Sequence, residues 1–241
     1  MKRKMKYFIF ISGSILLFFL LQYQFSSNNT WDSWSLPLSG KVIIIDPGHG
    51  APDPGAGPKG AFEKDIAFNI SVLLRDYLQE AGALVIMTRE DDFDLADKDL
   101  KGYSRRKTQD LKRRVKLINS SDGDLLVSIH LNSLPSSEWS GAQTFYYPRF
   151  DVNKQLAKFI QKEMEQNLEN TVRHAKAINH VYVIKEAKMP SVLVEAGFLS
   201  NPRERELLKT ESYQDKIAAC VYQGILRLYS EKPLKDIFSD E

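Results

Sequence analysis

The chain has 241 residues and a formal net charge of +2, with 33 Lys and Arg against 31 Asp and Glu. Four of these cations precede an uncharged apolar stretch, and without them the formal charge is −2. A nearly neutral chain argues against a nucleic-acid-binding protein, which would carry a strong excess of basic residues. The single cysteine, Cys220, excludes a disulfide within the chain and predicts a thiol packed in the core.

The uncharged stretch over residues 7–25 predicts an amino-terminal membrane helix. In a helix it would span about 28 Å, which is close to the thickness of the bilayer hydrocarbon. Basic residues before it and none directly after it predict that the amino terminus lies inside and the rest of the chain outside. No small-residue cleavage pattern follows, so residues 1–25 are expected to be an uncleaved signal anchor; removal of the segment would instead give a secreted protein. The polar residues 26–40 predict a stalk.

Residues 41–230 predict one α/β domain, followed by a carboxyl-terminal tail over residues 231–241. Apolar runs alternate with amphipathic stretches, which is typical of a mostly parallel, twisted sheet of about six strands with helices on both faces. The expected strands cover residues 41–46, 83–88, 124–130, 141–147 (nearer an edge), 180–184 and 191–196. The expected helices cover residues 63–81, 103–119, 151–169 and about 213–229.

Two histidines and two glutamates occupy comparable places in this pattern. His49 follows the first expected strand, and His130 and Glu195 end the third and the last. Glu63 opens the helix that follows the His49 loop. In an open parallel sheet, ligands bind beyond the carboxyl ends of the strands. We therefore expect all four side chains at one edge of the sheet.

The chemistry of these four residues suits a zinc centre. Two imidazoles and one carboxylate form a ligand set for Zn²⁺ that leaves a fourth tetrahedral position for water. We assign ligation to His49, Glu63 and His130. A carboxylate that is not a ligand can move the proton of a water activated in this way. Glu195 is expected to do so, because its apolar neighbours should raise its pKa.

Several of these residues also have simpler interpretations. His130 alone could be a structural histidine, and Glu63 alone could be a carboxylate favoured at the start of a helix. Asp65 is a rival ligand on a different helix face. Asp46 could bind a metal, although an Asp that ends a strand more often fixes its own turn. Asn132 shares a strand face with His130 and could orient a ligand or the substrate.

The remaining histidines and one basic segment carry weaker signals. His174 is expected at the surface, and His180 could line a cleft. Residues 101–116 contain eight Lys and Arg, which predict either a site for an anionic polymer or a solvated helix face paired with nearby aspartates. The second interpretation is preferred, with Arg113 or Arg114 buried against the sheet.

Four segments resemble the zinc-dependent N-acetylmuramoyl-L-alanine amidases of the Amidase_3 type. They are DPGHG (46–50), FEKDIAFNI (62–70), VSIHLNS (127–133) and SVLVEAGFLSN (191–201). The resemblance covers about residues 40–230 and implies hydrolysis of the amide between the lactyl group of muramic acid and the first alanine of the stem peptide in peptidoglycan. It also implies a twisted, mostly parallel sheet, zinc ligands at His49, Glu63 and His130, and a catalytic glutamate at Glu195.

Further segments are similar to the germination-specific members of this family from endospore-forming bacilli. They are WSLPLSGK (34–41), ALVIMTRE (83–90), KGYSRRK (101–107) and WSGAQTFYY (139–147), together with the short anchor. This resemblance implies action on spore-cortex peptidoglycan at the spore envelope, a step towards muramic δ-lactam that a partner deacetylase would follow. Ala51 departs from the second glycine of many members. Two alternatives stay open: a zinc peptidase acting within the stem peptide, and a non-catalytic wall-binding protein.

Overall fold

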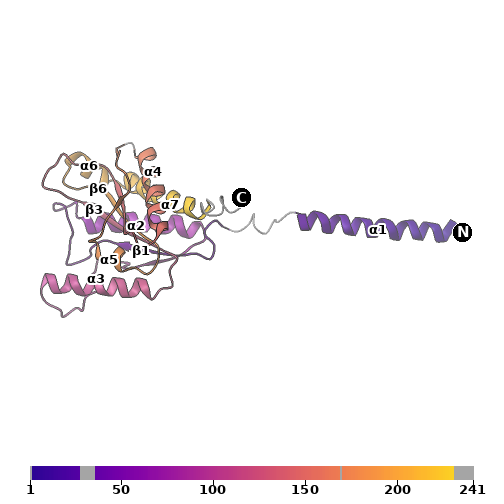
Figure 1. The fold of residues 1–241 in the computed structure, drawn as a ribbon, viewed down its shortest axis with the longest axis horizontal. Helices are drawn as coiled ribbons and strands as arrows, with labels where there is room; N and C mark the ends of the chain where they lie inside the picture. The colour runs from indigo at the N-terminus through magenta and orange to yellow at the C-terminus, as the bar shows by residue number, and fades with distance from the viewer. Residues whose placement is uncertain (1, 28–35, 169, 231–241) are drawn as a thin grey trace. The chain divides into compact units, whose positions relative to one another are not determined.

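The structure, a computed structural model, describes residues 2–27, 36–168 and 170–230. The chain divides into two compact units, Met1–Leu36 and Pro37–Glu241. The first contains the long helix α1 (Lys2–Ser27) (Figure 1).

Among the described residues, no helix is both long and apolar enough to cross a membrane. The expected anchor over residues 1–25 therefore stays a prediction. Residues 28–35 of the expected stalk and the expected tail over residues 231–241 lie outside the described residues.

The described part of the second unit contains a six-stranded sheet in the order β2-β1-β3-β6-β4-β5. Its strands are β1 (Val42–Pro47), β2 (Leu84–Met87), β3 (Leu125–Asn132), β4 (Gln143–Tyr146), β5 (Lys176–Ala177) and β6 (Ser191–Phe198). Neighbouring strands run parallel except β4 and β6, which are antiparallel. This confirms the expected mostly parallel α/β sheet, with β4 one strand from its edge.

Helices cover both faces of the sheet, as expected. One face packs against α2 (Glu63–Glu80), α4 (Asp151–Asn167) and α7 (Glu211–Ser230), which share the larger hydrophobic core with it. The other face packs against α3 (Tyr103–Asn119) and the short α5 (Tyr182–Glu186) around a smaller core. The short α6 (Pro202–Leu208) follows β6 (Figure 1). Cys220 is buried in α7, as the sequence predicts.

Strand β3 shows how one apolar run serves both cores. Leu125 and Val127 belong to the larger core, and Leu126 belongs to the smaller one. Successive side chains of a strand point to opposite faces, so a strand covered on both sides is apolar almost throughout. The same alternation places Ser128 and His130 on the face that α3 covers, towards the carboxyl end of the strand.

The expected strand over residues 180–184 is wrong. This segment leads into α5, where Val183 and Ile184 are both buried and the Lys185 and Ala187 amides bond to carbonyls four residues earlier. Two adjacent buried side chains fit one turn of helix over the smaller core better than the alternating faces of a strand. The two-residue β5 takes the edge position beside β4 instead.

Candidate metal centre

Three of the four expected site residues meet at the carboxyl ends of β1 and β3. One potential ligand atom from each of His49, Glu63 and His130 lies within 4.8 Å of the others. The Glu63 carboxylate stands between the two imidazoles, with Oε2 3.1 Å from His49 Nε2 and Oε1 2.8 Å from His130 Nδ1. The structure therefore brings together three residues that lie far apart in the sequence.

Glu63 is fixed by backbone groups as well as by the histidines. The Ala56 amide donates a hydrogen bond to Oε2 (2.9 Å), and the Leu131 amide donates one to Oε1 (3.1 Å). Burial alone would raise the pKa of Glu63, but its hydrogen bonds to His130 and His49 outweigh burial and hold the pKa well below its usual range. Glu63 thus presents an ionised, immobilised carboxylate.

Asp53 orients His49 from behind. His49 Nδ1 donates to Asp53 Oδ2 (2.8 Å), which leaves Nε2 facing Glu63. Asp53 is held in turn by two residues of α3, the Tyr103 hydroxyl (2.7 Å) and Lys107 Nζ (2.6 Å). Burial alone would lower the pKa of His49, but hydrogen bonds to Asp53 and Glu63 raise it to about 9. A carboxylate behind the imidazole is the usual second partner of a metal-binding histidine.

The donor set of this cluster fits a divalent cation. Two imidazole nitrogens and one carboxylate oxygen are ligands that zinc and related metals share. Two ionised carboxylates, Glu63 and Asp53, flank His49, so the local potential favours a bound positive charge. Within the described residues, His49, Glu63 and His130 therefore form a possible metal site.

Glu195 lies on β6 beside His130. The two residues are register partners on adjacent parallel strands, so their side chains point to the same face of the sheet. Glu195 Oε2 is buried and has no hydrogen-bond partner among the described residues. Burial raises the pKa of Glu195 to about 7, in the direction that its apolar neighbours predict. A carboxyl group with this pKa can both accept and donate a proton near neutral pH.

The two rival carboxylates have other partners. The Asp65 side chain is half exposed and lies 3.5 Å from Lys64 Nζ. Asp46 is buried and accepts hydrogen bonds from Thr88, Ser128 and Arg114. Neither belongs to the cluster of possible metal ligands in the described chain.

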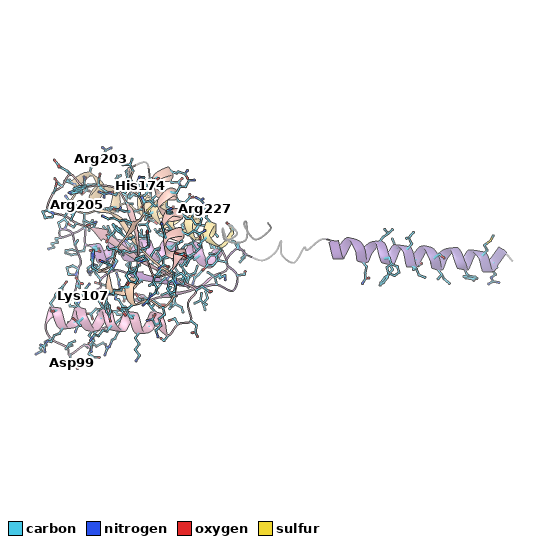
Figure 2. The ribbon with its side chains drawn as sticks, viewed as in Figure 1. Asp99, Lys107, His174, Arg203, Arg205 and Arg227 are labelled. Atoms are coloured by element: carbon cyan, nitrogen blue, oxygen red, sulfur yellow. The ribbon has the colours of Figure 1, made fainter. Side chains whose placement is uncertain are left out.

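The other two histidines lie apart from the centre. His174 is exposed, pairs with Glu165 at 3.4 Å, and lies well away from α3 and Lys107 (Figure 2). His180 is exposed and lines a hollow beside β4 and β5 with Phe145 and Lys176, not with the metal cluster.

Half of the eight Lys and Arg in the basic segment over residues 101–116 pair with aspartates, namely Arg106, Lys107, Arg113 and Arg114. Arg106 contacts Asp94 and Arg113 contacts Asp97, each at 2.5 Å. Arg114 is buried, as one of the two expected arginines. These contacts favour the solvated, paired face over a polymer site.

Three residues that support His49 were not found from the sequence. Tyr103 and Lys107 lie four apart, so they share one face of α3, but their spacing does not say what that face contacts. Asp53 lies in a loop rich in glycine and proline that has no periodicity. Local patterns carry no information about these long-range contacts.

Residues 43–227 match the family model described as N-acetylmuramoyl-L-alanine amidase. The chain is 55% identical over 232 residues to the germination-specific N-acetylmuramoyl-L-alanine amidase of Bacillus subtilis (strain 168), an overlap that covers 96% of this chain and 98% of the relative. It is 36% identical over 195 residues to the amidase LytC of the same organism, over 80% of this chain and 36% of that relative.

Solved structures agree with these sequence relationships. The CwlD amidase from Clostridioides difficile, solved in complex with the GerS lipoprotein, is 42% identical with a TM-score of 0.77, over 79% of this chain and 98% of that chain. An N-acetylmuramoyl-L-alanine amidase from Clostridium difficile 630 is 32% identical with a TM-score of 0.69, over 80% of this chain and 98% of that chain. The chain therefore belongs to the Amidase_3 family of N-acetylmuramoyl-L-alanine amidases.

Proposed function

We propose that this amidase is zinc-dependent, with His49, Glu63 and His130 as the metal ligands and Glu195 as the catalytic acid and base. The observation that carries the proposal is the convergence of three ligand atoms within 4.8 Å of one another, next to a strand whose Glu195 has a buried, unpartnered Oε2 among the described residues. Catalytic acids and bases need a pKa near the working pH, which the value of about 7 for Glu195 supports.

The reaction adds water across the amide that joins the lactyl carbonyl of muramic acid to the first alanine. When bound, zinc supplies a Lewis acid for the carbonyl oxygen and for the attacking water. Glu195 takes a proton from the water as the new C–O bond forms, and returns it to the alanine nitrogen as the C–N bond breaks. Asp53 keeps the His49 ring turned so that Nε2 faces Glu63. The products are a lactyl carboxylate on the glycan and a peptide with a free amine.

Spore-cortex peptidoglycan is the substrate we favour. This choice rests on a relative that is named as germination-specific. The chain is 55% identical to it, and the overlap covers 98% of the relative. Removal of the peptide leaves muramic acid ready for conversion to muramic δ-lactam, for which a deacetylase acting on the product would be needed. A lipoprotein is the other partner class we propose for direct binding, since the C. difficile CwlD was solved with GerS.

The enzyme acts on the cell wall, outside the cytoplasm. We extend this to attachment at the membrane through residues 1–25, with four cations before the apolar stretch over residues 7–25 as the support. Residues 41–230 would then form the zinc amidase domain beyond a stalk.

One experiment tests metal, bond and substrate together. The full chain is purified, its zinc content is measured, and cortex and vegetative peptidoglycan are digested and analysed by mass spectrometry. We expect bound zinc and free lactyl carboxyl groups on the glycan, released faster from cortex. Shortened peptides that stay attached to the glycan would indicate a zinc peptidase instead. Binding to the wall without any product would indicate a non-catalytic protein.

A further inference from the structure

A buried arginine that is not one of the expected site residues donates hydrogen bonds to the backbone beside two of the candidate metal ligands. Arg89 follows β2 and has only 2% of its surface exposed. In the described chain, no carboxylate forms an ion pair with its guanidinium, although its side chain lies 5.1 Å from the centre of the Phe68 ring. Taking an unpaired cation out of water is costly, so the position of this side chain needs a physical reason.

All four hydrogen bonds from Arg89 go to backbone carbonyls. Nε donates to Pro47 (3.3 Å), and Nη1 donates to Asp91 (3.1 Å). Nη2 donates to two carbonyls at once, those of Gly48 (2.9 Å) and Lys64 (2.7 Å).

The two carbonyls that share Nη2 belong to the neighbours of two proposed ligands. Gly48 directly precedes His49, and Lys64 directly follows Glu63. A single nitrogen atom therefore ties the loop after β1 to the first turn of α2. These carbonyls are each one residue from a proposed ligand, so the bridge joins the two ligand-bearing backbones, in addition to the hydrogen bonds from the Glu63 and Lys64 amides to the Ala56 and Pro54 carbonyls.

A second buried arginine provides an internal comparison. Arg114 also donates to the same loop, at the Pro47 and His49 carbonyls, but it forms ion pairs with Asp46 (2.9 Å) and Asp110 (3.0 Å). Its burial is thus compensated by two carboxylates. Burial and the nearby Arg114 charge lower the pKa of Arg89 to about 10, because they outweigh the attraction of the Asp46, Asp92 and Asp110 carboxylates, none of which forms an ion pair with Arg89 in the described chain.

The need for a stable core does not explain Arg89. Replacing buried charges by apolar side chains of similar volume is often neutral or stabilising. What an apolar side chain would lose is the planar fork of N–H donors that reaches carbonyls on separate segments.

We propose that Arg89 is a positioning residue that holds His49 and Glu63 at their mutual separation and thereby sets the metal affinity of the centre. This inference rests on the proposed ligand role of His49 and Glu63. Arg89 acts on the ligands through the backbone, because its hydrogen bonds go to carbonyls and not to the ligand side chains.

The test measures zinc binding and folding separately in the full chain. Zinc dissociation constants are obtained by competition with a chromophoric chelator, and unfolding free energies are obtained for the metal-free protein in urea. The variants are Arg89→Met, Arg89→Lys and, as a control for lost stability alone, Ile160→Ala, which truncates a buried side chain in α4.

We expect Arg89→Met to weaken zinc binding by about 10- to 100-fold, as is typical when an outer support of a metal ligand is lost. Arg89→Lys should fall between wild type and Arg89→Met, because one ammonium group cannot reproduce the fork. Ile160→Ala should lower the unfolding free energy and leave the zinc dissociation constant unchanged.

Two results would overturn the inference: a wild-type zinc dissociation constant in the Arg89 variants, or a loss of affinity in Ile160→Ala as large as theirs. If Arg89→Met does not fold, the zinc dissociation constant of Arg89→Lys is compared with those of wild type and Ile160→Ala, and that comparison decides the test. His49→Ala separates this inference from the proposed function. If wild type binds zinc no more tightly than His49→Ala, the ligand assignment fails, whatever Arg89 does.

Discussion

Asp46 and Glu195 are carboxyl groups on the same face of the sheet, separated by β3, and their surroundings are opposite. Asp46 accepts hydrogen bonds from Thr88 (2.6 Å), Ser128 (2.8 Å) and Arg114 (2.9 Å). Burial alone would raise its pKa, but the Arg114 charge, the Thr88 hydrogen bond and the nearby His130 outweigh burial and lower the pKa. Glu195 Oε2 has no such donor in the described chain, and burial raises the pKa of Glu195 to about 7.

This difference is the one expected between a carboxylate that supports the fold and the carboxylate that we propose for the reaction. A buried charge with every partner in place holds segments together and stays ionised. A buried carboxyl group that lacks a partner gains most when substrate and water provide one. Environments that push two pKa values apart are how a protein assigns different roles to the same chemical group.

The largest change in free energy is expected from Arg114→Met, which removes the arginine that pairs with Asp46. The substitution leaves the Asp46 and Asp110 carboxylates buried without their cation. We expect the unfolding free energy to fall by about 3–5 kcal/mol, as for a buried pair that loses one partner. Urea unfolding followed by circular dichroism measures this change.

Arg113→Met is the matched control one residue away. The Arg113 side chain is 41% exposed and pairs with Asp97, so its loss should lower the unfolding free energy by no more than about 1 kcal/mol. Equal losses in the two variants would mean that Asp46 does not depend on Arg114 for its role in the fold.

Glu195→Gln tests the proposed role of Glu195 as the catalytic acid and base. We expect amidase activity to fall by about 10²-fold or more, equivalent to roughly 2.7 kcal/mol in the barrier, because the amide cannot accept and return a proton. Zinc content and unfolding free energy should match those of wild type. Product release from peptidoglycan and metal analysis of the same sample check this. Loss of zinc together with activity would make Glu195 a ligand rather than the base.

A smaller effect than those of Arg114→Met and Glu195→Gln is expected from Ser128→Ala. It removes one donor to Asp46 and leaves Thr88 and Arg114 in place. The unfolding free energy should fall by about 1.5 kcal/mol, the low end for a hydrogen bond to a charged group. Activity of the folded enzyme should stay close to wild type in the same peptidoglycan assay. A drop in activity as large as that of Glu195→Gln would erase the distinction between the two carboxylates.

Much of the fold was predictable because buried parallel strands are read directly as apolar runs. The run over residues 41–46 became β1 (Val42–Pro47), and the amphipathic spacing over residues 103–119 became α3 with the same bounds. The strand predicted over residues 180–184 is wrong, because a short apolar segment fits a buried helical turn equally well. The helix α6 was not expected, although Asn201 caps it and Pro202 opens it, because seven residues are too few for a clear period.

The site divides in the same way. His49, Glu63 and His130 were found because each lies at the end of a strand or the start of a helix, and topology brings such positions together. Asp53 and Arg89 were not found, because their contacts join loops and strand ends that no local pattern relates. Sequence reasoning thus identified the three residues of the possible metal site and did not identify those that hold them in place.

Gly48 has a consequence for how variants of this enzyme should be interpreted. A Cβ atom added at this position would lie 2.5 Å from the His130 ring, too close for both to keep their places. The smallest side chain here would displace an imidazole that is 82 positions further along the chain. A Gly48→Ala substitution would thus look like a conservative change in a loop, but its effect on the enzyme would be that of displacing the His130 side chain.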